Sequence, residues 1–361
     1  MLRYLVCAAH IFIVLLISQN TSADEKSWSD RLTPNADFRL RYESIEAEGL
    51  PDRNRGRYRL RMGLAAELYD DINLVVSLAT GAENPVSRNV TFGDSFGIDE
   101  FGLELAYVDW QISAAWRVYA GKMKNPMMRA GHAPLIYDSD LNPEGLATKF
   151  STDHWFANIG AFVVEEGAVG GDSFLYHVQS GFSIDRGRNR GNLLVGAGYF
   201  TYTNTVGRLP FFFGLPRGNT VDTNDRYVFD YENSELFFEY ETKAGRWPLQ
   251  LFGQWTKNHS VTRQGTAYAA GMKVGKAAKP GMAELAWTWQ DIEADAVIGA
   301  FNDSDFGGGG TDASGHIIEL NYFLRDHIWL AATLMLNKVD AFQRTERDYR
   351  RLQLDIEFKF N

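Results

Sequence analysis

The chain has 361 residues, 45% of them hydrophobic, with a formal net charge of −10 and a mean hydropathy of −0.27. This hydropathy argues against a helical membrane protein, and the negative charge argues against a nucleic-acid partner. The one cysteine, Cys7, lies near the N-terminus, so the rest of the chain can form no disulfide, thiolate metal site or cysteine nucleophile.

The N-terminus has the pattern of a cleaved secretory signal peptide. Arg3 precedes an apolar run from Leu5 to Ile17, and small residues follow as far as Ala23. The run is shorter than the roughly 18–20 residues that an uncleaved membrane anchor needs. We therefore expect residues 1–23 to be removed and residues 24–35 to form a short N-terminal segment.

The stretch from Gly56 to Tyr69 predicts a long β-strand with one apolar and one polar face. Apolar residues occupy one parity: Tyr58, Leu60, Met62, Leu64, Ala66 and Leu68. Arg57, Arg59 and Arg61 occupy the other. A tilted membrane-spanning strand has about 9–11 residues, and arginines are costly against lipid but stable in a wet lumen. The stretch therefore predicts a strand of a membrane barrel whose arginines line the interior.

Segments of the same period recur to the end of the chain. They cover residues 36–44, 56–69, 72–80, 102–112, 115–122, 144–151, 154–165, 172–184, 192–203, 234–242, 247–257, 265–276, 281–291, 314–324, 327–338 and 349–361. This makes about sixteen strands, an even number, as bacterial outer-membrane barrels require. The connections alternate between short turns and a second set that contains the long loops 81–101, 123–143, 204–233 and 292–313.

This alternation distinguishes a barrel from a soluble sandwich or propeller, which has no reason to keep it. We predict an all-β fold over residues 36–361: a transmembrane antiparallel β-barrel of about sixteen strands with short periplasmic turns and long outer loops. The loop with Asn302, Asp303, Asp305 and the glycines 307–310 is expected to be a mobile surface loop.

Three blocks of sequence resemble those of a group of proteobacterial putative porins. They are Leu78–Gly93, Gly121–Pro126 and Tyr137–Ala147, in the same order and at similar spacing. The resemblance implies a general-porin-like channel in the outer membrane of a Gram-negative bacterium, in contact with lipids and lipopolysaccharide and assembled as a homotrimer. Such barrels usually end on an aromatic residue that the barrel-assembly machinery reads, whereas this chain ends in Phe360-Asn361.

The resemblance also implies that the loop 123–143 folds into the barrel and narrows it. Asp138 and Asp140, with Glu144 at the exit of the loop, would then present carboxylates to the lumen. The opposing wall would come from the first, second and last strands, which are neighbours once the barrel closes. Their arginines on the inner parity are Arg39, Arg41, Arg57, Arg59, Arg61 and Arg351.

The tenth of sixteen strands lies across from the second, so Glu235, Glu239 and Glu241 would also face the arginines. Acidic and basic walls would create a transverse field that orients polar solutes. Two alternatives stay open: the arginines pair with carboxylates and fill the lumen, or Asp138 and Asp140 cap turns.

The leading hypothesis is a porin for passive diffusion of small hydrophilic solutes and ions. A channel that prefers anions, sugars or organic acids is the alternative; a ladder of arginines favours anions, and the inward Phe200 and Tyr202 are too few to decide for sugars. An adhesin or a barrel enzyme is less favoured, since no histidine shows a convincing serine partner by spacing. No motif predicts a cofactor, and the residues after Asp138 lack the glycine and glutamate of an EF-hand loop.

Overall fold

The computed structural model describes residues 27–81, 83–167, 171–187 and 191–360. The predicted signal peptide lies outside the described residues. Residues 1–32 form one unit, whose described part contains a single turn of 3-10 helix, η1 (Trp28–Arg31). Residues 33–361 form the other unit. No helix among the described residues is long and apolar enough to cross a membrane.

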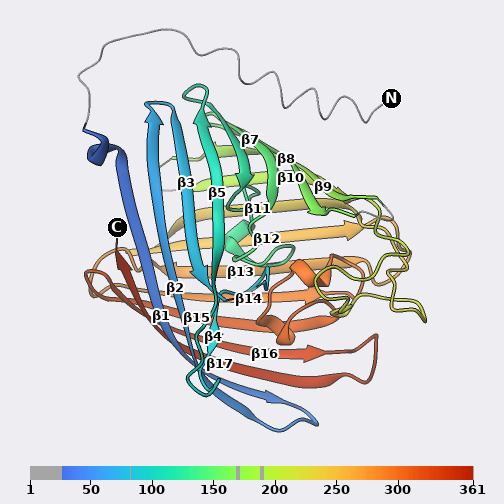
Figure 1. Cartoon of the computed structure of the whole chain (residues 1–361). Helices are drawn as coiled ribbons and strands as arrows, with labels where there is room; N and C mark the ends of the chain where they lie inside the picture. Colours follow the sequence, from blue (N-terminus) through green and yellow to red (C-terminus); the bar gives the residue numbers. More distant parts are fainter. Residues whose placement is uncertain (1–26, 82, 168–170, 188–190, 361) are drawn as a thin grey trace, which may run out of the picture. The chain divides into compact units, whose positions relative to one another are not determined.

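The second unit is a closed antiparallel β-barrel of sixteen strands. These are β1 (Leu32–Ala47), β2 (Arg53–Tyr69), β3 (Ile72–Thr80), β5 (Phe101–Gln111), β6 (Trp116–Lys122), β7 (Glu144–Ser151), β8 (Trp155–Glu165), β9 (Ser173–Asp185), β10 (Asn192–Tyr202), β11 (Glu232–Ala244), β12 (Trp247–Asn258), β13 (Thr266–Gly275), β14 (Ala283–Ile292), β15 (Ala313–Arg325), β16 (Ile328–Val339) and β17 (Arg347–Phe360). Each strand pairs with the next, and β1 closes the ring against β17, so that Phe38 lies opposite Phe358 (Figure 1). Closure leaves no free strand edge. The predicted fold class and strand number are confirmed.

The period-two pattern sets which side chains face the interior. On β11, Glu235 and Phe237 are almost fully buried, whereas Leu236 and Phe238 between them are 56% and 43% exposed. The exposed apolar positions form the outer surface, as expected where a strand meets lipid on one side and a polar lumen on the other.

The connections alternate between short turns at one end of the barrel and longer loops at the other, as predicted. Short turns join β2 to β3 at residues 70–71, β11 to β12 at residues 245–246 and β15 to β16 at residues 326–327. At the opposite end, four connections are long: residues 81–100, 123–143, 203–231 and 293–312. The first contains the short strand β4 (Val90–Thr91), which pairs with β2.

The long loops build an apolar core inside the ring of strands. The turn η2 (Ala130–His132) of loop 123–143 contacts β11, β12 and β13, and η4 (Phe306–Gly308) of loop 293–312 contacts β15, β16 and β17. Phe211 of loop 203–231 stacks on Phe301 with ring centroids 5.6 Å apart. Leu135, Ile298 and Phe306 are fully buried in the same cluster. The loops therefore hold one another and the wall by hydrophobic burial.

The prediction that the acidic, glycine-rich loop 293–312 lies on the surface is wrong. Asn302, Asp303 and Phe306 are buried, and Asn302 Nδ2 donates to Leu135 O of loop 123–143 at 2.7 Å. The apolar run from Ala296 to Phe301 explains the difference, because it pulls the acidic and glycine-rich part of the loop inward with it.

Candidate functional site: an arginine wall met by two inward loops

The six arginines predicted from the sequence line one side of the lumen. They are Arg39 and Arg41 on β1, Arg57, Arg59 and Arg61 on β2, and Arg351 on β17. We call this set the arginine wall. Strand closure brings it together, because β1 pairs with both β2 and β17. The exposed fraction of these side chains runs from 3% at Arg351 to 21% at Arg61.

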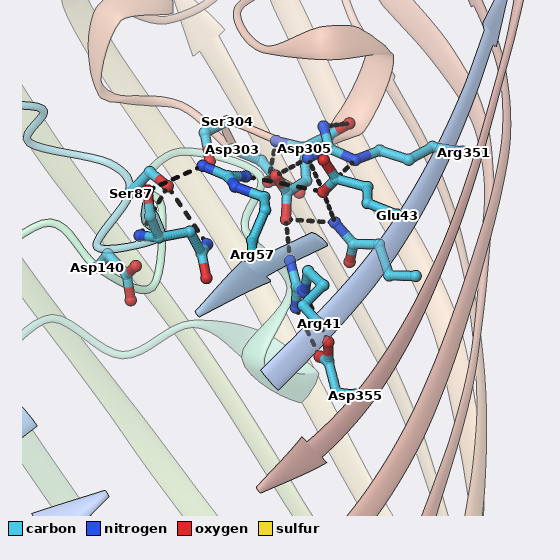
Figure 2. Close-up of polar contacts among 12 residues, drawn as sticks. Arg41, Glu43, Arg57, Ser87, Asp140, Asp303, Ser304, Asp305, Arg351 and Asp355 are labelled. Atoms are coloured by element: carbon cyan, nitrogen blue, oxygen red, sulfur yellow. Dashed lines mark hydrogen bonds and ion pairs between the residues drawn. The ribbon is translucent and has the colours of Figure 1, made fainter. Parts of the chain in front are cut away.

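Arg41 and Arg351 of the arginine wall bind the loop 293–312. Asp305 lies 3.1 Å from Arg41 Nη1 and 2.7 Å from Arg351 Nη2, and Figure 2 shows the three side chains pointing toward one another. Arg41 also pairs with Asp355 at 2.7 Å, and Arg351 also pairs with Glu43. Charge-assisted contacts of this kind are short and directional, so they fix the loop to the wall.

Arg61 of the arginine wall binds the loop 123–143. Arg61 Nη2 lies 2.9 Å from Asp140 and 2.8 Å from Glu104. Arg59 instead pairs within the barrel, with Asp37 at 2.6 Å and Glu357 at 3.1 Å. Of the three loop carboxylates named from the sequence, Asp140 is therefore the one that contacts the arginine wall.

Asp138 does not face the wall. Its carboxylate accepts hydrogen bonds from the backbone N–H of Asp140 at 2.7 Å and of Ser304 at 2.9 Å, and it is buried where the two loops meet. Its own N–H donates to Phe301 O at 2.9 Å. The turn-capping alternative is thus the one that the geometry shows for Asp138.

The carboxyls at this loop–loop contact differ in their pKa. Burial raises the pKa of Asp138 well above its usual range, and the neighbouring Asp303 raises it further. Burial likewise raises the pKa of Asp303 to about 7, with a further contribution from Asp305. For Asp140 and Asp305, burial acts in the same direction but the arginines outweigh it. Arg61 lowers the pKa of Asp140 to about 2, and Arg351 and Arg41 hold that of Asp305 well below its usual range.

The expectation that Glu144 presents its carboxylate to the lumen is wrong. Glu144 is the first residue of β7 and shares a face with Leu146, which is 47% exposed on the outside of the barrel. It pairs there with Lys122 at 2.5 Å. Since strand faces alternate strictly, the residue that starts the strand is committed to the outer face by the apolar residue two positions later.

The acidic residues of β11 lie across the barrel, but the loop 123–143 covers two of them. Glu239 accepts from the N–H of Gly131 at 2.6 Å, and Glu235 accepts from Gln179 at 2.6 Å and lies 2.8 Å from His177. Glu239 therefore anchors the loop directly. Glu235 does so through Gln179 and His177 of β9, which contact Met128 and Tyr137 of the loop. Glu241, farther along β11, is exposed.

Free space remains toward the short-turn end of the barrel. A cavity of about 780 Å³ is lined by His132, Glu241, Gln250, Lys273 and Glu284, among other residues. Its lining carries both signs of charge. No group of three or more His, Cys, Asp or Glu side chains within the described ranges is arranged to hold a metal ion.

Sequence reasoning missed several contacting residues. Arg88 pairs with Glu104 at 3.3 Å, and Asn89 accepts from Arg39 at 2.7 Å. Both lie in loop 81–100. Glu43 was not missed, because it shares the inner parity of Arg39 and Arg41 and the strand pattern alone places it in the lumen.

Comparisons with known proteins agree with this architecture. A family model described as a putative porin matches residues 47–231 and 221–360. Among solved structures, the chain is similar to OprB of Pseudomonas putida at high pH, with a TM-score of 0.64, 12% identity, and 92% of this chain and 95% of that one covered. It is also similar to a loop-deletion mutant of OmpT, an outer membrane protein of Vibrio cholerae, with a TM-score of 0.54, 14% identity, and 92% and 100% covered.

A third similar structure is a triple mutant of the Rhodopseudomonas blastica porin, with a TM-score of 0.51, 10% identity, and 91% of this chain and 100% of that one covered. At these identities the structural likenesses establish the shared barrel fold and nothing about the solute. No curated protein matches the chain.

Proposed function

Because this chain belongs to the putative porin family, we propose that it forms a passive channel for small hydrophilic solutes and ions in the outer membrane of a Gram-negative bacterium. The observation that carries the proposal is the interior of the barrel. Two loops cross it and contact the wall through Asp140 and Asp305, so the narrowest part of the passage is bounded by fixed charges of both signs. Shape and charge at such a point decide which solutes pass.

The constriction consists of the arginine wall on one side and the docked loops 123–143 and 293–312 on the other. Each guanidinium group that pairs with Asp140, Asp305 or a strand carboxylate forms a fixed dipole with it. These dipoles orient a polar solute. The cavity lined by Lys273 and Glu284, which lies toward the short-turn end of the barrel, carries both signs of charge and keeps the path hydrated toward the periplasm.

The exposed apolar residues of the strands, such as Leu236 and Phe238, supply the outer belt that contacts lipid and lipopolysaccharide. The resemblance noted from the sequence adds a homotrimer and insertion by the barrel-assembly machinery, and both remain predictions. Chemical cross-linking of the folded protein in detergent tests the trimer.

A channel selective for sugars gains no support from the aromatic residues named from the sequence. Phe200 and Tyr202 are fully buried and pack against Tyr137 and Phe301 of the loops, so they hold the loop core. The arginine wall supports a preference for anions.

Liposome swelling tests the proposal. Vesicles that contain the folded protein should swell in isotonic solutions of small neutral sugars and amino acids, at rates that fall steeply with solute size. Swelling no faster than in protein-free vesicles, from protein whose barrel is folded, would refute the channel.

A further inference from the structure

Two arginines of the wall differ from the other four in their partners. Arg41, Arg59, Arg61 and Arg351 each have a carboxylate oxygen within 2.8 Å. The nearest carboxylate oxygens are 3.9 Å from Arg39 and 3.7 Å from Arg57, beyond hydrogen-bonding distance.

A neutral residue stands between these two guanidinium groups. Arg39 Nη2 donates to Asn89 Oδ1 at 2.7 Å, and Arg57 Nη2 donates to the backbone oxygen of Asn89 at 3.1 Å. The Nε atoms of Arg39 and Arg57 are both buried and, among the described residues, without a hydrogen-bond partner. One neutral residue therefore accepts from both arginines, from Arg39 at its side-chain oxygen and from Arg57 at its backbone oxygen, and each guanidinium group keeps an Nε donor without a partner among the described residues. Figure 2 shows Arg57 in this position, between Ser87 and Glu43.

We infer that Arg39 and Arg57 form a binding site for a small oxyanion, a carboxylate or phosphate group, which enters by taking the place of the Asn89 side chain. The inference deepens the proposed function and rests on it, since the oxyanion would be a solute of the channel. The planar guanidinium group of arginine can donate two parallel hydrogen bonds to the two oxygens of a carboxylate or phosphate. A hydrogen bond to such a charged acceptor is about twice as strong as one to the neutral amide of Asn89.

The side chain of Asn89 can rotate away from Arg39. It is partly exposed, on loop 81–100, and within the described part of the chain its Nδ2 makes a single hydrogen bond, to Ser87 Oγ at 3.3 Å. The pairing of Val90 and Thr91 with β2 is made by the backbone, so it survives a rotation of the Asn89 side chain. The same change relieves the repulsion between Arg39 and its neighbours on the wall, because the oxyanion brings the negative charge that the amide lacks.

Single-channel recording in planar bilayers tests this site. Conductance is measured against concentration in sodium acetate, sodium phosphate and sodium chloride. Binding predicts saturation in acetate, in phosphate or in both, and the two arms show which oxyanion the site prefers. Conductance in chloride, which lacks the paired oxygens, should rise nearly linearly over the same range. Equal saturation in chloride would overturn the inference, because it would show a general charge effect.

Three variants separate the site from the rest of the wall. Asn89→Ala removes the competing amide and should lower the half-saturating oxyanion concentration about fivefold. Arg39→Gln should raise it about tenfold. The matched control is Arg117→Gln, which removes one inward guanidinium group on β6 that pairs with Asp109. It should change the half-saturating oxyanion concentration less than twofold.

Asn89→Asp keeps the inference testable if Arg39→Gln does not fold. It places a permanent carboxylate between the two arginines and should abolish saturation while the barrel remains intact. Conductance steps that never saturate, or an Asn89→Ala variant identical to the parent, would overturn the site and leave the channel standing. No steps from folded protein in any salt would refute the proposed function, and the site with it.

Discussion

Replacement of Asp305 by Asn should release the loop 293–312 from the arginine wall. Asp305 accepts side-chain hydrogen bonds from Arg41 at 3.1 Å and Gln353 at 2.9 Å, and it pairs with Arg351 at 2.7 Å. All of these groups are at least four-fifths buried, so solvent screening is weak. The substitution keeps the size of the side chain and removes its charge.

The size of the effect follows from these contacts. A hydrogen bond to a charged group contributes about 1.5–3 kcal/mol. Arg41 keeps Asp355 and Arg351 keeps Glu43, so the two arginines are not left as bare buried charges. We therefore expect a loss near the cost of one to two such bonds, about 3 kcal/mol, which is about a 100-fold shift in the docking equilibrium of the loop.

Hydrogen exchange measures this shift directly. Amides of residues 299–311 in the variant should exchange about 100-fold faster than in the parent, while amides of β12 stay unchanged. Glu165→Gln is the control, because Glu165 pairs with Arg208 at the surface, where such a pair contributes less than about 1 kcal/mol. Unchanged protection of residues 299–311 in Asp305→Asn would refute the account of how this loop is held.

Three further predictions concern the same region. Gly131→Ala should displace the loop 123–143 and raise single-channel conductance, because a Cβ at Gly131 would lie 2.3 Å from the ring of Phe252 and its φ of +60° is unfavourable for other residues; unaltered conductance would contradict this. The raised pKa of Asp303, about 7, means that the docked loops bind a proton that the released loops lose near pH 3.8. This proton alone should weaken docking by up to about tenfold per unit as pH rises from 4 to 7. Exchange of the loop amides in Asp303→Asn should therefore depend less on pH, and the raised pKa of Asp138 should leave a dependence of the same sign. Arg59→Glu should raise cation preference in reversal-potential measurements and lower barrel stability, since it places a second carboxylate beside Asp37; an unchanged ion preference would show that Arg59 only fills the lumen.

The barrel could be predicted from the sequence because its signals are local. Alternation along each strand, as in Gly56–Tyr69, sets the inner and outer faces, and the lengths of the connections set the direction of each strand. Closure of the ring then places β1 between β2 and β17, so that the arginines of these three strands line the same side of the lumen.

The loops could not be predicted in the same way. Asp305 reaches Arg41 over a separation of 264 residues, and Asn89 reaches Arg39 over 50, so neither contact leaves a periodic trace in the sequence. The composition of loop 293–312 indicated exposure, whereas a short apolar run in it decided the burial. The outward position of Glu144, by contrast, could be read from the sequence, because the predicted strand 144–151 is the observed β7 and Glu144 shares the parity of the apolar Leu146.

The reversal potential of single channels across a salt gradient tests the central claim most directly. Purified mature protein in a planar bilayer should give stable conductance steps, with a reversal potential that indicates anion preference and that moves toward cation preference in Arg39→Gln. The account would be contradicted by a folded barrel that gives no steps, or by channels whose ion preference is the same with and without Arg39.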